Sequence, residues 1–258
     1  MKSVTIKVIF IIVVIFIFGI LVGIFINSII IEDEEDNDIS DFENVLIFNE
    51  PYSINIKPSD FVYEINNTYL PYKPGTKFIY EGETDEGFEH IEVLVTNETR
   101  MIMGIKCVIV RDTVTLDGEI IEDPFDWFAQ DKFGNVWYLG EDSKELEDGE
   151  VVSTEGSWES GKDGALPGII MFAQPNVGIT YRQEYYKGEA EDMATIVSLN
   201  EEMEINNKKY ENLLKVKEFT PLEPDVVEYK YYAPGIGVIF ESSEDGSEKI
   251  VLKEIITI

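Results

Sequence analysis

The chain has 258 residues, with 51 acidic side chains against 20 basic ones and a formal net charge of −31. Nucleic acid and anionic lipid headgroups are polyanions, so this charge excludes them as partners. The charge suits a cationic ligand or partner. The alternative is that the acids serve only solubility. A hydrophobic content of 44% excludes a wholly disordered chain.

A long apolar segment lies near the N-terminus. Residues 8–31 carry no charge, and a helix of this length reaches about 36 Å, enough to cross a hydrocarbon core of about 30 Å. A cleaved signal peptide has a shorter apolar core and a small-residue cleavage site, which is missing here. The sequence therefore predicts an uncleaved transmembrane signal anchor.

The charges beside this segment predict its orientation. Lys2 and Lys7 precede it, and an acidic run at residues 32–38 follows it. The positive-inside rule then places residues 1–7 in the cytoplasm and the C-terminal domain outside, in a single-pass protein of the cell membrane. Asn66 and Asn97 begin N-glycosylation tripeptides, which agrees with an extracytoplasmic location.

Residues 32–68 are predicted to form an acidic stalk or linker, because like charges keep such a run extended and solvated. Residues 69–258 have the pattern of an extracytoplasmic antiparallel β-domain. Runs rich in Val, Ile, Tyr and Phe alternate with turn signals, among them Asp117-Gly118, Asp148-Gly149, Asp245-Gly246 and the weaker Asn206-Asn207. The expected fold is all-β: a meander of roughly ten to twelve strands in a strongly curved sheet, a half-open barrel or a sandwich.

The stretch from Asp123 to Asp142 combines acids with aromatic side chains. We read it as a hairpin with its turn at 131–134, in which Gln130 faces Asn135 and Phe128 faces Trp137. Residues 155–171 are expected to be an irregular cover over one face. Trp127, Trp137, Tyr138 and Trp158 are therefore candidates for a groove that binds a glycan or an apolar ligand, although cross-strand aromatic packing explains the same residues without a ligand.

The sequence offers little catalytic chemistry. His90 is the one histidine, and Cys107 is the one cysteine, which lies in an apolar run typical of inert buried thiols. No nucleophile elbow, zinc motif, EF-hand or phosphate-binding loop is present. Carboxylate-based hydrolysis by Asp126 or Glu141 stays open, because acids are everywhere. No catalytic residue is assigned, and the sequence favours a non-enzyme over an enzyme.

Calcium is the one cofactor that the sequence leaves open, since it binds six to eight oxygen ligands. The main candidates are Asp123, Asp126, Asp131, Glu141 and Asp142. Further oxygen donors are Asn135, Glu189, Glu191 and Asp192.

Several stretches resemble a group of uncharacterised extracytoplasmic β-domains of archaeal and bacterial membrane-anchored proteins and lipoproteins. They are LPYKPGTKFIYEGE, DWFAQDKFGNVWYLGED, EGSWESGKDGALPGIIM, YRQEYYKGEAEDMA and KYYAPGIGVIFE. PGTKFIYEG and YYAPGIGVI are more distantly similar to LolA-like or TapB-like curved-sheet domains. The resemblance implies an antiparallel sheet with an apolar concavity, and no activity. A composition rich in Lys, Ile, Asn and Glu adds the expectation of an archaeal source.

Together these features predict a non-catalytic, membrane-anchored cell-surface protein whose acidic β-domain binds a ligand or partner or contributes to the envelope. The alternatives are a membrane-tethered carboxylate-based hydrolase and a calcium-dependent adhesion or assembly module.

Overall fold

The computed structural model describes residues 52–258. One 3₁₀ turn, Pro58–Asp60, precedes strands that pair in antiparallel fashion throughout. The strands are β1 (Phe61–Val62), β2 (Thr76–Glu83), β3 (Phe88–Ile102), β4 (Ile105–Leu116), β5 (Glu119–Glu122), β6 (Phe125–Asp131), β7 (Val136–Asp142), β8 (Glu145–Glu147), β9 (Glu150–Ser153), β10 (Trp158–Glu159), β11 (Leu166–Met171), β12 (Thr180–Arg182), β13 (Glu184–Tyr185), β14 (Met193–Ile205), β15 (Lys208–Thr220), β16 (Glu223–Ala233), β17 (Gly237–Ser243) and β18 (Lys249–Thr257).

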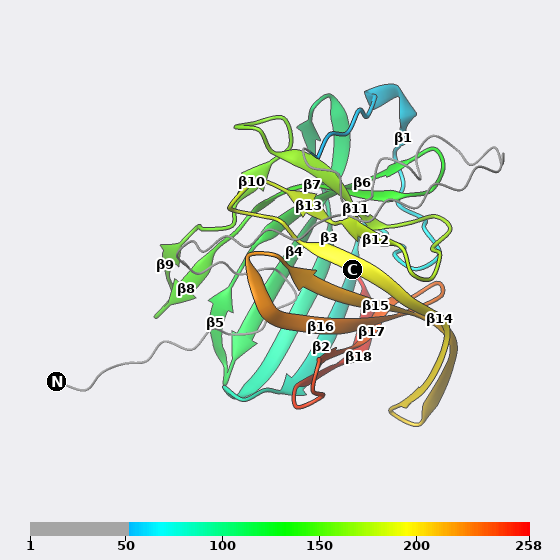
Figure 1. The fold of residues 1–258 in the computed structure, drawn as a ribbon. Coiled ribbons are helices and arrows are strands. Elements are labelled where there is room, and N and C mark those ends of the chain that lie inside the picture. The colour runs from blue at the N-terminus through cyan, green and yellow to red at the C-terminus, as the bar shows by residue number, and fades with distance from the viewer. Residues whose placement is uncertain (1–51) are drawn as a thin grey trace, which may run out of the picture.

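The sheet curves until it nearly closes on itself. Backbone pairs lead from β11 through β7, β6, β4, β3, β2, β18, β17, β16 and β15 to β14. β12 pairs with β14 and the following β13 pairs with β11, so residues 180–185 connect the two ends. In Figure 1, β15–β17 lie across β3 and β4, with the interior of this barrel-like sheet between them. The predicted all-β, strongly curved antiparallel sheet is confirmed.

Local turn chemistry explains much of the meander. Asp117 and Gly118 have φ angles of 49° and 93° between β4 and β5, and Asp148 and Gly149 have 51° and 79° between β8 and β9. Positive φ at both central residues defines the tight turn that matches the twist of paired strands. Asn206 and Asn207 also have positive φ, between β14 and β15. These predicted hairpins are confirmed.

The hairpin of β6 and β7 forms as predicted, but its predicted register is wrong by one residue. Gln130 pairs with Val136, and Phe128 pairs with Tyr138. Asp131 is hydrogen-bonded to Asn135, and Gly134, with φ of 97°, adds the extra turn residue. A left-handed glycine after a type I turn shifts the register by one residue. Consequently Tyr138 lies on the face of Phe128, while Trp137 lies on the opposite face.

Residues 155–171 are more regular than the sequence predicts. They contain β10 and β11, and β11 pairs with β7 on one side and β13 on the other. The apolar run Leu166–Met171 therefore completes the sheet and does not act as an irregular cover. Gly168 allows the close approach to β13, because a Cβ atom there would lie 2.3 Å from the backbone of Gln183.

The segment before β2 lies against the sheet. β1 pairs with the end of β6, and the side chains of Tyr52, Ile65 and Leu70 are buried. The described part of the predicted stalk, residues 52–68, is thus packed on the domain. No helix among residues 52–258 is long and apolar enough to span a membrane. The predicted anchor, residues 8–31, lies outside the described residues.

Candidate functional site

The interior of the sheet is acidic. Alternating strand residues point inward, and most inward positions are the apolar core expected of a barrel-like sheet. Some inward positions carry carboxylates, and one carries a lysine. We call this set the inner carboxylate cluster: Asp112, Asp126, Glu141, Glu184, Glu218, Glu241 and Lys230.

The strand pattern itself places these acids inside. On β4, Asp112 alternates with the buried Val110 and Val114. On β17, Glu241 alternates in the same way with the buried Ile239. Because alternate residues share a face, neither acid can turn outward without exposing its apolar neighbours.

Lys230 is the cation at the centre of the cluster. Its Nζ atom lies 2.6 Å from Oε2 of Glu218 and 3.9 Å from Oε1 of Glu241. Burial alone would lower the pKa of Lys230, but the charges of Glu218 and Glu241 outweigh burial and raise this pKa well above its ordinary value. Lys230 is therefore a fixed positive charge.

Glu218 is fully supported by donors. Besides Lys230, it accepts a hydrogen bond from Nε2 of Gln183 at 2.9 Å and one from the Tyr232 hydroxyl at 3.3 Å. Such a network compensates for the desolvation of an ionised group. Four other acids of the cluster each have one carboxyl oxygen without a hydrogen-bond partner among residues 52–258: Asp112, Glu141, Glu184 and Glu241.

Asp112 faces the cluster from across the barrel. Its strand β4 is separated from β16 of Lys230 by β3, β2, β18 and β17. Nevertheless, the charges of Asp126, Glu241 and Lys230 act on its carboxyl group. Asp112 is 2% exposed, and its Oδ1 atom has no hydrogen-bond partner among residues 52–258. Burial, together with the negative charges of Asp126 and Glu241, raises the pKa of Asp112 well above its usual range.

Burial is the main cause of raised pKa values in the other acids too. It raises the pKa of Glu241 to about 7 and that of Glu184 to about 8. Further carboxyls outside the cluster as defined follow the trend: the pKa of Glu89 and of Glu228 rises to about 8, and that of Glu122 rises to about 9. The interior thus holds several carboxyl groups that bind protons near neutral pH.

A row of aromatic rings adjoins the acids. Tyr72, Phe128, Tyr138 and Trp158 follow one another with centroid distances of 5.4, 4.8 and 5.2 Å. Indole Nε1 of Trp158 donates to Oε2 of Glu184 at 2.9 Å, and the Tyr138 hydroxyl contacts both Asp126 and Glu141. The aromatic row and the cluster therefore form one continuous inner surface.

Of the four aromatic residues predicted to bind a ligand, the structure brings together only Tyr138 and Trp158. Trp137 lies on the opposite face, edge-on to Phe61, and its Nε1 atom donates to Asp131 at 2.9 Å. The guanidinium carbon of Arg100 lies over the ring of Trp127, 4.0 Å from the ring centroid. All four are less than 9% exposed, so each is packed by the protein itself.

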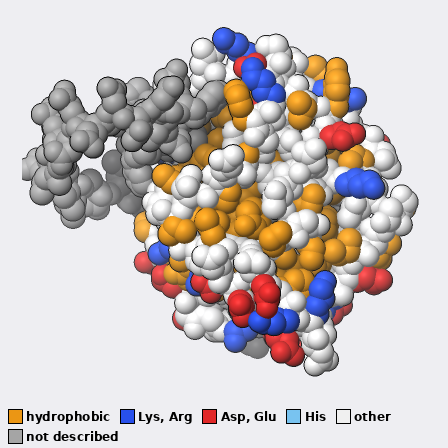
Figure 2. Space-filling model, turned by 90° about the vertical axis from the view of Figure 1, so that its right-hand side faces the viewer, with side chains coloured by type: hydrophobic (Ala, Val, Ile, Leu, Met, Phe, Trp, Pro, Cys, Tyr) orange, Lys and Arg blue, Asp and Glu red, His pale blue; other side chains and the backbone are white. Residues whose placement is uncertain are grey.

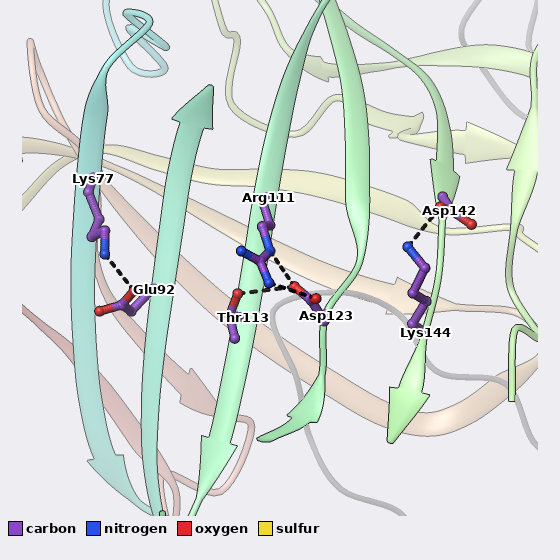
Figure 3. A network of polar contacts seen from close by, with 7 residues as sticks. All are labelled: Lys77, Glu92, Arg111, Thr113, Asp123, Asp142 and Lys144. Atoms are coloured by element: carbon purple, nitrogen blue, oxygen red, sulfur yellow. Dashed lines mark hydrogen bonds and ion pairs between the residues drawn. The ribbon is translucent and has the colours of Figure 1, made fainter. Parts of the chain in front are cut away.

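The five acids predicted to bind calcium occupy three separate places. Asp126 and Glu141 belong to the inner cluster. Asp131 holds the β6–β7 turn through the backbone amides of residues 133 and 135. Asp123 and Asp142 lie on the outer face, as Figure 3 shows, each beside a cation.

That outer face carries ordinary surface ion pairs. Arg111 Nε lies 2.5 Å from Asp123, whose Oδ1 also accepts from Thr113 at 3.2 Å, and Lys144 lies 2.8 Å from Asp142 (Figure 3). Pairs of this exposure contribute about 0–1 kcal/mol each.

Among the other oxygen donors that the sequence suggests, Asn135 donates to Asp131 in the β6–β7 turn at 2.9 Å. Glu189, Glu191 and Asp192 lie between β13 and β14. Burial and the charges of Glu184 and Glu218 raise the pKa of Asp192 well above its usual range, so Asp192 adjoins the inner carboxylate cluster.

Within residues 52–258, no three His, Cys, Asp or Glu side chains gather in a way that could hold a metal ion. Cys107 is fully buried, and burial raises the pKa of its thiol to about 12, so it is inert as a nucleophile. His90 lies 3.3 Å from Glu81 at a half-buried position. The burial of Cys107 agrees with the inert thiol that the sequence predicts.

Two features of the surface of residues 52–258 differ from the interior. The glycosylation candidates Asn66 and Asn97 are both exposed, and Asn66 exchanges two hydrogen bonds with Gln130 at 2.8 Å. On the face shown in Figure 2, hydrophobic side chains gather at the centre and charged side chains lie mainly toward the margin. Neither feature concentrates the acidic charge as the interior does.

Five members of the cluster are not among the site residues predicted from the sequence: Asp112, Glu184, Glu218, Lys230 and Glu241. Their signal is a charged residue on the apolar face of an alternating strand, as in Val110-x-Asp112-x-Val114. That pattern identifies each residue singly. It does not show that strands far apart in the chain bring them together.

No protein-family model matches the sequence, and no curated protein matches it. Two solved structures are similar. A Bacteroides fragilis protein described as exported, with a YmcC-like fold, has 16% identity and a TM-score of 0.43, covering 74% of this chain and 100% of its own. A Parabacteroides distasonis protein described as a lipoprotein has 12% identity and a TM-score of 0.39, covering 74% and 99%. Both are bacterial, and neither description mentions a LolA-like domain, so the archaeal source and the LolA-like similarity stay predictions. Similarity at this level bears on neither activity nor partners.

Proposed function

We propose that the chain is a non-catalytic, membrane-anchored extracytoplasmic protein that binds a small organic cation in the acidic interior of its β-domain. The uncharged segment at residues 8–31 and the lysines before it support the anchor and its orientation. The inner carboxylate cluster supports the ligand class. The observation that carries the proposal is the buried Asp112 carboxyl group, which lacks a partner on Oδ1 among the described residues.

The cluster has more acids than its own cation can neutralise. Lys230 is paired with Glu218 and Glu241. Within the inner carboxylate cluster, this leaves Asp112 and Asp126 without a cation of their own. Burying a polar group without a partner costs about 1–3 kcal/mol, and burying an uncompensated charge costs more. Folds retain such groups mainly where they serve a site. A bound cation would offset this cost.

The surroundings favour an organic ammonium group over a metal ion. No set of three ligating side chains converges among residues 52–258, whereas the rings of Tyr72, Phe128 and Tyr138 adjoin the carboxylates. Ammonium groups bind to carboxylates and to aromatic faces together, each ring contributing about 0.5–2 kcal/mol. Hydrolysis is less well supported, because the hydroxyl of Tyr138 occupies the position between Asp126 and Glu141.

Thermal unfolding of the full-length protein in detergent tests this proposal. At fixed ionic strength, we expect putrescine, spermidine or choline to raise Tm by several degrees, since a ligand at a hundred times its Kd stabilises by about 2.7 kcal/mol. Asp112→Asn should abolish that shift. The matched outer-face variant Asp142→Asn should keep it.

Equal shifts in the two variants would assign the effect to surface charge and would contradict the proposal. A rise in Tm with calcium but with none of the ammonium compounds would show that the ligand is a metal ion and not an organic cation. No shift with any cation would return the acids to a role in solubility.

A further inference from the structure

A single tyrosine hydroxyl lies between two carboxyl groups on neighbouring strands. Oη of Tyr138 lies 2.6 Å from Oδ1 of Asp126 and 2.9 Å from Oε2 of Glu141. Asp126 on β6 and Glu141 on β7 are also direct cross-strand partners. Asp126 is 5% exposed, Tyr138 is 7% exposed and Glu141 is 3% exposed, so bulk water does not screen the contact.

The number of protons in this contact follows from its geometry. A phenol has one proton and can donate it to one acceptor, and an ionised carboxylate has none to donate. At 2.6 and 2.9 Å, two ordinary two-centre hydrogen bonds at one hydroxyl require two protons, and the second proton then belongs to a carboxylic acid. We propose that Asp126, Tyr138 and Glu141 form a proton-binding site that holds one extra proton at neutral pH and loses it as the pH rises.

The neighbours of the two acids decide which one carries the proton. Lys230 acts on Asp126 and favours its ionised form, whereas the negative charges of Asp126, Glu184 and Glu122 act on Glu141. The proton therefore resides on Glu141, which donates to Tyr138, and Tyr138 donates to Asp126. The direction of the pKa values agrees: burial raises that of Asp126 to about 7, and burial with nearby acids raises that of Glu141 well above its usual range.

No other group around the contact replaces this proton. The charged and titratable groups that face it are Asp112 on β4, Glu122 on β5, Glu184 on β13, Lys230 on β16 and Tyr72 before β2. Lys230 is the one cation among them, and it is already paired with Glu218 at 2.6 Å.

The contact lies at an irregular point of the sheet, which makes it sensitive to loss of the proton. The β6–β7 register shifts between Asp126 and Phe128, and Gly140, next to Glu141, has a φ of 144°. Once both acids are ionised, like charges face each other across paired strands with one hydroxyl proton between them. This proton site shares Asp126 with the proposed cation site, but its test uses no ligand, so the two proposals can fail separately.

Infrared spectroscopy of the full-length protein at neutral pH provides the test. Because Asp112 and other buried acids also absorb as protonated carboxyls, the informative signal is the difference between variants. Glu141→Gln should remove one protonated carboxyl band and should release one proton fewer on unfolding. Asp142→Asn, at the neighbouring outer position, should change neither. A Glu141→Gln spectrum and proton count equal to those of the unmodified protein would overturn the proposal.

A measurement without substitutions covers the case in which Glu141→Gln does not fold. Neutron diffraction from deuterated crystals of the unmodified protein at neutral pH should show two deuterium atoms around Oη of Tyr138, one toward Asp126 and one toward Glu141. A single deuterium over both contacts would show that both acids are ionised and would overturn the proposal.

Discussion

We expect the free energy of unfolding to be greatest near pH 5 and to fall by about 3 kcal/mol or more between pH 5 and pH 9. Even one buried carboxyl whose pKa shifts by about two units would produce a change of this size. Burial raises the pKa of Glu241 and of Asp126 to about 7, of Glu89 and of Glu184 to about 8, and of Glu122 to about 9.

The sign follows from these directions. A carboxyl whose pKa is higher in the folded state binds its proton more tightly there than in the unfolded chain. Its contribution to stability is complete below the unfolded pKa of about 4 and is lost as the pH rises through the folded pKa. Paired surface acids act oppositely: hydrogen bonding to Lys77 lowers the pKa of Glu92, so its contribution is lost in stronger acid.

Urea unfolding of the full-length protein at pH 5, 7 and 9, without polyamines or divalent cations, measures this dependence. Asp112→Asn should raise the stability at pH 9 more than at pH 5. Asp142→Asn, which removes an acid from the outer face, should leave the pH dependence unchanged. A stability that stays flat or increases from pH 5 to pH 9 would mean that the inner acids titrate normally.

The second large effect is expected from Lys230→Met. Removing one partner of a buried ion pair costs about 3–5 kcal/mol, because the other charge stays buried without compensation. Here Glu218, at 2.6 Å, and Glu241, at 3.9 Å, lose their common cation. The loss should be greatest at pH 9 and smaller at pH 5, where Glu241 binds a proton instead.

Two comparisons make the measurement specific. Lys144→Met removes the partner of Asp142 on the outer face and should cost less than about 1 kcal/mol. Adding Glu218→Gln to Lys230→Met should recover part of the stability, since the double variant no longer buries that unpaired charge. Equal costs for Lys230→Met and Lys144→Met would show that the interior is not the low-dielectric site described.

Local sequence signals predicted the fold class well. Asp117-Gly118 and Asn206-Asn207 specify tight turns through positive φ, and the β-branched runs beside them form the strands. The β6–β7 register was missed because one glycine, Gly134, adds a residue to the turn. A shift of one residue exchanges the faces of a strand, so Tyr138 was placed on the wrong side relative to Phe128.

The inner cluster lies beyond the reach of such signals. Asp112 and Lys230 are 118 positions apart in the sequence, yet the charge of Lys230 acts on Asp112 because several intervening strands curve around the interior. Alternation shows that Asp112 shares a face with Val110 and Val114, but the identity of the opposite wall depends on closure through residues 180–185. Composition, in turn, suggested a surface role for acids that the fold buries.

Carbon-13 NMR of carboxyl-labelled Asp and Glu side chains in the full-length protein tests the central claim most directly. We predict a separate inner class of carboxyls that titrates at about pH 7 or above, because burial raises the pKa of Glu241 to about 7, of Glu184 to about 8 and of Glu122 to about 9. Signals of the inner class should disappear singly in Asp112→Asn and Glu141→Gln. Titration of every carboxyl below about pH 5 would contradict the account, because the interior would then hold neither protons nor an unmet demand for a cation.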